Sequence, residues 1–123
     1  MCTTLVVDAA NVVGSRPDGW WKDRAGAARR LHEDLLVADT SYDLVVLVLE
    51  GGAKGGVRPG KDAHVRTVHA RGSGDEAIVA EARAAAERGE RVTVVTADRF
   101  LGARCTGVGA MVLSPSWLLS QLP

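Results

Sequence analysis

Three aspartates stand where side chains of this type can do chemistry together. Asp8 and Asp98 come at the ends of two apolar runs, and Asp75 opens a segment of helical character. Crowded carboxylates repel one another unless protons or cations lie between them. Mg²⁺ and Mn²⁺ prefer hard oxygen ligands of this kind, and a metal so held can activate water for attack at phosphorus. The residue types therefore predict a site for metal-dependent hydrolysis.

The apolar runs predict the strands that must position these acids. Continuous runs of β-formers are typical of strands buried on both faces of a parallel sheet. Helical spacing of apolar residues separates the runs. Strands are expected at residues 4–8, 44–49, 65–69, 92–96 and 111–113. Helices are expected at residues 22–38, 73–88, 99–104 and 116–122, with loops at 12–23 and 51–61.

This alternation predicts an α/β fold in three layers. Right-handed crossovers place helices on both faces of a central parallel sheet. We expect the strand order 3-2-1-4-5, which sets the first and fourth strands side by side. Ligands of such sheets bind at the carboxyl ends of the strands. Asp8, Asp75 and Asp98 are therefore expected at one edge of the sheet, with Asn11 beside them to position water or a phosphate oxygen.

Each aspartate also has a purely structural interpretation. Asp8 can cap the turn after its strand together with Asn11. Asp75 can interact with the dipole of its helix, and Asp98 can be the N-cap of the next helix. Convergence of the three on one edge favours the functional interpretation.

The other polar candidates are more ambiguous. Glu76 is a nearby metal-ligand candidate, but it lies three residues after Ser73, which is the spacing of a capping box. Glu50, after the second strand, is either an outer acid of the site or a surface residue. Trp20 and Trp21 can stack on bases, although packing of at least one against the first helix is favoured.

Basic residues cluster although the formal net charge is zero. The net charge gives no general reason to expect nucleic acid. The clustering nevertheless favours a basic rim around the acidic centre, with a solvated surface as the alternative. The candidate contacts to a phosphate backbone are Lys54, Arg58, Lys61, Arg99 and Arg104.

Length and composition indicate one domain, residues 1–123. The hydrophobic fraction of 46% and the charged fraction of 24% are those of a globular protein. No apolar run approaches the roughly 20 residues of a membrane span, so no membrane partner is expected. Cys2 and Cys105 do not suggest a disulfide framework or a zinc site. A cytoplasmic protein without a signal peptide is expected.

Three motifs surround the aspartates: Val7-Asp8-Ala9-Ala10-Asn11-Val12-Val13, Gly74-Asp75-Glu76-Ala77-Ile78 and Val94-Val95-Thr96-Ala97-Asp98-Arg99. They resemble the motifs of NYN domains, which are PIN-like ribonucleases, and the likeness is greatest to the bacterial YacP-like branch. The resemblance covers nearly the whole chain, in motif order and spacing.

The resemblance implies a PIN-like α/β fold and metal-dependent cleavage of RNA phosphodiester bonds. By motif position it implies that Asp8, Asp75 and Asp98 bind Mg²⁺ or Mn²⁺ and that Asn11 lies beside the site. Glu76 stands where the family has the second of two aspartates. PIN-like domains often pair, so a homodimer is a possible assembly.

Two departures keep a second function open. The usual Asp-Gly-Tyr-Asn is Asp8-Ala9-Ala10-Asn11 here, and no further acid follows Asp98. The first hypothesis is a metal-dependent ribonuclease. The second is an RNA-binding or regulatory module with a degenerate site. A nucleotide-binding domain would need a glycine-rich turn after the first strand, which is missing.

Overall fold

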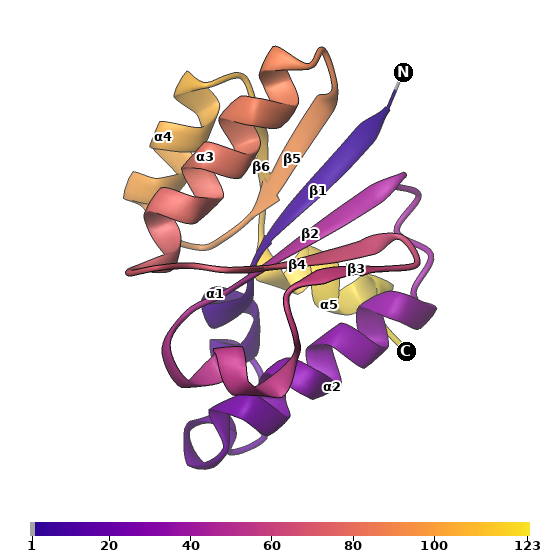
Figure 1. Ribbon diagram of the computed structural model, residues 1–123, viewed down its shortest axis with the longest axis vertical. Coiled ribbons are helices and arrows are strands. Elements are labelled where there is room, and N and C mark those ends of the chain that lie inside the picture. Colours follow the sequence, from indigo (N-terminus) through magenta and orange to yellow (C-terminus); the bar gives the residue numbers. More distant parts are fainter. Residues whose placement is uncertain (1) are drawn as a thin grey trace.

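The computed structural model describes residues 2–123 and contains a six-stranded sheet between two layers of helices (Figure 1). From one edge to the other, the strands lie in the order β3-β4-β2-β1-β5-β6. The strands are β1 (Thr3–Asp8), β2 (Leu44–Leu49), β3 (Gly60–Asp62), β4 (Val65–His69), β5 (Arg91–Val95) and β6 (Met111–Leu113).

The α-helices divide between the two faces of the sheet (Figure 1). On one face are α1 (Ala9–Gly14), α2 (Arg24–Val37) and α5 (Pro115–Gln121), and on the other are α3 (Gly74–Glu87) and α4 (Arg99–Gly107). Two 3-10 helices, η1 (Trp20–Lys22) and η2 (Gly51–Gly56), lie in the connections next to α2. Within residues 2–123, no helix combines the length and the apolarity needed to cross a bilayer.

The central strands are buried because successive side chains enter opposite faces of the sheet. Leu5 and Val7 of β1 belong to the core cluster beneath α1, α2 and α5. Val6 belongs to the cluster beneath α3 and α4, together with Ile78 and Leu101. Both faces of β1 therefore need apolar residues, which explains its lack of polar alternation.

The predicted α/β layers and the order of the five predicted strands are confirmed, but the sheet is not wholly parallel. The additional strand β3 pairs antiparallel with β4, with Asp62 opposite Val65. Ala63 turns the chain between them with a φ of 52°. All three residues of β3 are exposed, so no apolar alternation marked this strand in the sequence.

The prediction of loops at residues 12–23 and 51–61 is wrong in part. Helix α1 begins at Ala9, directly after β1, because Asp8 caps it. Residues 51–56 form η2 despite their four glycines. Helices of six residues are too short to show a clear apolar period, which is why both were missed.

Close packing of η2 against α2 generates a stability prediction. A Cβ atom at Gly56 would lie 2.0 Å from the backbone oxygen of Ala25. We expect Gly56→Ala to lower the free energy of unfolding by roughly 1–3 kcal/mol, because α2 and η2 must separate. At Gly55 the added Cβ would lie 3.8 Å from the Ala25 Cβ. Gly55→Ala is therefore the matched control, and equal urea midpoints for the two variants would contradict the prediction.

Candidate active site

Asp8 is a buried carboxylate at the carboxyl end of the central strand β1, with 4% of its surface exposed. Its Oδ2 accepts hydrogen bonds from Asn11 Nδ2 at 2.6 Å and from Thr96 Oγ1 at 2.7 Å. Its Oδ1 accepts from the Asn11 backbone N–H at 3.4 Å, which caps α1. Asp8 therefore has the capping role considered for it, and Asn11 is directed at Asp8.

Asp98 reaches the same edge because β5 lies beside β1 in parallel, with Val95 opposite Val7. Its Oδ1 accepts from the Leu101 N–H at 3.0 Å and so caps α4. The Asp98 backbone N–H donates to Thr96 Oγ1 at 3.1 Å, and that same hydroxyl donates to Asp8. Thr96 thus connects the two acidic segments.

Asp75 completes the group from the first turn of α3. Burial raises the pKa of its carboxyl group above the ordinary value of 3.8, and the charges of Asp98 and Asp8 raise it further. Within residues 2–123, no side-chain or backbone donor hydrogen-bonds to this carboxylate. Asp75 therefore lies close enough to Asp98 and Asp8 for their charges to act on its carboxyl group.

The two glutamates have different surroundings from those that the sequence suggested. The Ser73 side chain does not cap α3. Instead, Glu50 Oε2 accepts from the Gly74 N–H at 2.8 Å. Glu76 is exposed and pairs with Arg104 at 2.9 Å, and this hydrogen-bonded guanidinium lowers the pKa of Glu76. The capping-box interpretation is wrong, because the acid that reaches this helix end is Glu50, which follows β2.

The donor set suits a hard divalent cation, although the protein side chains do not enclose one by themselves. Among residues 2–123, no group of three or more His, Cys, Asp or Glu side chains is arranged to hold a metal ion. Mg²⁺ commonly takes one or two carboxylates and keeps several waters. The Asp75 carboxylate, which lacks a donor and is repelled by its neighbours, fits that requirement.

The predicted basic contacts are dispersed. Lys54 Nζ donates to the Ala70 carbonyl at 2.9 Å, and Arg104 pairs with Glu76. Arg58 and Lys61 are exposed and line a separate shallow pocket at the β3 edge of the sheet. Arg99 is exposed in the first turn of α4, immediately after Asp98. It is the predicted cation that adjoins the acids along the chain.

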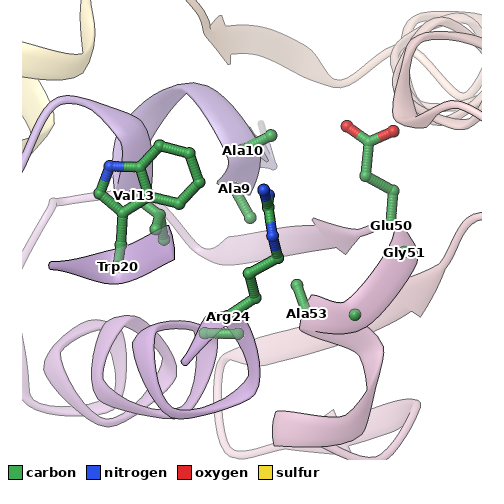
Figure 2. Close-up of a pocket in the computed structure, with 10 residues that line it drawn as sticks. Ala9, Ala10, Val13, Trp20, Arg24, Glu50, Gly51 and Ala53 are labelled. Atoms are coloured by element: carbon green, nitrogen blue, oxygen red, sulfur yellow. The ribbon is translucent and has the colours of Figure 1, made fainter. Parts of the chain in front are cut away.

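A pocket of about 390 Å³ adjoins the acidic edge and was not predicted as a site (Figure 2). Ala9 and Ala10, which follow Asp8, form part of its wall, and Glu50 forms another part.

The Arg24 guanidinium lies 5.0 Å from the centre of the Trp20 ring. Trp20 packs against the core beneath α1 and α2, as predicted for at least one of the tryptophans, whereas Trp21 is exposed. No local signal in the sequence indicated this contact, because Trp20 lies in η1 and Arg24 begins α2.

These features define an α/β protein with an acidic edge at the carboxyl ends of its central strands. No family model matches the chain, and no curated protein matches it either. The solved structures that are similar to this chain include two crystal structures of Rae1 (YacP) from Bacillus subtilis. A point mutant matches with a TM-score of 0.73 and 22% identity, over 96% of this chain and 73% of that one. The other structure matches with a TM-score of 0.65 and 22% identity, over 98% and 72%.

The likeness to the YacP-like branch, which the three motifs predicted, is confirmed as a likeness of fold. Since the fold neighbours share 22% of their residues with this chain, they do not identify its site residues. The roles of the aspartates therefore rest on the geometry of the site and on the motifs.

The Thr96 hydroxyl provides a test of how Asp8 is held. We expect Thr96→Val to lower the free energy of unfolding by roughly 1–3 kcal/mol, because a buried carboxylate loses a donor. Thr67 is equally buried, and its Oγ1 has no partner within residues 2–123. Thr67→Val is therefore the matched control and should be neutral or stabilising. Chemical denaturation measures both, and a harmless Thr96→Val would contradict the role assigned to this hydroxyl.

The raised pKa of Asp75 predicts a pH dependence of stability. Above pH 3.8 and up to the raised pKa, the folded state binds more protons than the unfolded chain. The contribution of Asp75 to stability must therefore fall as pH rises through that window. We expect the unfolding free energy of the wild type, relative to Asp75→Asn, to decrease across it and then level off. Denaturation in metal-free buffer measures this difference, and a relative stability that increases with pH would refute the raised pKa.

Proposed function

We propose that this protein is a metal-dependent ribonuclease that hydrolyses RNA phosphodiester bonds with Mg²⁺ or Mn²⁺. The observation that carries the proposal is that three carboxylates gather at one edge of the sheet, where burial and then repulsion from Asp98 and Asp8 raise the pKa of Asp75. A divalent cation among them would remove that repulsion. The NYN-type motifs and the fold shared with Rae1 (YacP) support the same reading.

Asp8, Asp75 and Asp98 are the residues proposed to hold the cation. When bound, such a metal supplies a Lewis acid that activates water and stabilises charge at phosphorus. Thr96 and Asn11 hold the Asp8 carboxylate in a single orientation through their hydrogen bonds. Glu76 was predicted as a further ligand, and it would have to leave Arg104 to serve as one.

The basic residues proposed to contact RNA differ in whether they already have a partner within the protein. Arg99, Arg58 and Lys61 are exposed and can meet phosphates without breaking an internal contact. Lys54 and Arg104 already have partners in the protein. Arg99 adjoins Asp98, so we place the phosphate backbone across the start of α4. Such contacts supply affinity that depends on salt but not on sequence.

The alternative is an RNA-binding or regulatory module whose acidic site no longer supports chemistry. Two observations favour it. Asp8 and Asp98 both cap helices, and no ready-made group of three ligands lies within residues 2–123. In this case RNA binds at the same edge, and adding a divalent metal produces no cleavage.

Cleavage of a labelled single-stranded RNA decides between the two functions. We expect cleavage with Mg²⁺ or Mn²⁺ that stops in chelator. Asp75→Asn should reduce the rate by about a hundredfold or more, the scale for loss of one electrostatic stabiliser. The same variant should lose the rise in melting temperature that Mn²⁺ gives the wild type, because a ligand of the native state stabilises it.

Asp75 is the preferred position for this test because its carboxylate accepts no hydrogen bond from residues 2–123 that the exchange would break. Asp62→Asn is the matched control, since it makes the same change in charge on the exposed strand β3. Equal cleavage by the wild type and Asp75→Asn would refute the ribonuclease proposal. RNA binding without any cleavage would favour the alternative.

A further inference from the structure

We infer that the pocket beside the acidic edge takes one nucleobase of the bound RNA strand, stacked on the paired Trp20 and Arg24 side chains. This inference rests on the proposed function, because it requires an RNA strand across the carboxyl edge of the sheet. It adds a base-recognition site, whereas the aspartates address only the phosphate.

The first support is position. The pocket shares a wall with the acidic edge, because Ala9 and Ala10 line it and follow Asp8 directly. Glu50, which lies across the pocket from Trp20 in Figure 2, reaches the N–H of Gly74, which precedes Asp75. A strand whose phosphate lies at the aspartates therefore has an adjacent nucleotide beside the pocket.

The second support is the shape and surface of the pocket. Its volume of about 390 Å³ lies within the range of small-ligand sites. Much of its wall consists of alanine and glycine, so it offers flat surfaces with few flexible side chains in the way. Those lining residues are Ala9, Ala10, Ala28, Gly51, Gly52 and Ala53.

The third support is the stack already present. The Arg24 guanidinium lies over the Trp20 ring, 5.0 Å from its centre. Unstacked RNA bases bind on aromatic rings and on guanidinium planes. Because Arg24 is exposed, a base placed against its guanidinium would extend this contact without moving the tryptophan.

The occupant is a base and not a phosphate because of the charges around the pocket. Arg24 provides one positive charge, but the Glu50 carboxylate also lines the pocket and would repel an anion. The remaining wall is mainly apolar, which favours an uncharged ring. Nucleobases meet these conditions, and phosphate groups do not.

Binding measured in chelator tests the inference separately from catalysis. The probes are a short labelled single-stranded RNA and an oligomer of the same length made of abasic ribose phosphates. Stacking of one base is worth about a tenfold gain in affinity, so the wild type should bind the RNA about tenfold more tightly. Gly52→Leu should lose most of this preference while keeping its affinity for the abasic oligomer. Gly52 lines the pocket, and a Cβ added there would lie 3.6 Å from Arg24 Cδ.

Gly107→Leu is the matched control, because a Cβ there has no neighbour within 4 Å and the residue ends α4, far along the chain from the pocket. It should keep the tenfold preference. If Gly52→Leu does not fold, Ala10→Leu fills the pocket from the exposed start of α1. Full preference for RNA in a folded pocket-filling variant overturns the inference, as does a wild type without any preference. If the protein binds RNA in a base-dependent manner but does not cleave it, the inference of a base site stands and the ribonuclease proposal is refuted.

Discussion

The structure depends on how one negative charge is kept in the interior. Asp8 lies at the end of a strand that is buried on both faces, so its carboxylate is almost wholly removed from water. A buried carboxylate is stable only when donors or cations compensate it. Thr96 and Asn11 supply the donors on Oδ2. Their positions tie the end of β1 to the start of α1 and to the segment that leads into α4.

A second constraint follows from the first, because compensation of Asp8 brings other acids near it. The Thr96 hydroxyl that serves Asp8 also accepts from the Asp98 N–H, and Asp75 faces both charges. The hydrogen bonds that hold Asp8 in place therefore also bring Asp98 close to Asp8, and the charges of both acids act on Asp75. Glu50 extends this arrangement, since its bond to Gly74 joins the start of α3 to the wall of the Trp20–Arg24 pocket. The candidate chemical site and the candidate base site therefore share one framework.

Much of the fold could be predicted because β1, β2 and β5 are mainly apolar and buried over nearly their whole length. Such strands leave few arrangements other than a parallel sheet with helices on both sides. Strand β3 could not be predicted, because all its residues are exposed and its pairing with β4 gives no apolar pattern. Helix α1 was missed for a related reason, since its six residues are too few for a helical period.

For the candidate site as well, some features could be predicted from the sequence and others required the tertiary structure. The sequence by itself determined the places of the three aspartates at the ends of strands and at a helix start, because the apolar runs show where the strands end. Only the tertiary structure decided which donors each acid receives. Glu50 holds the start of α3 from 24 residues away, and Thr96 reaches Asp8 across 88 residues. Contacts of that range depend on how the elements pack, and the local sequence carries no signal for them.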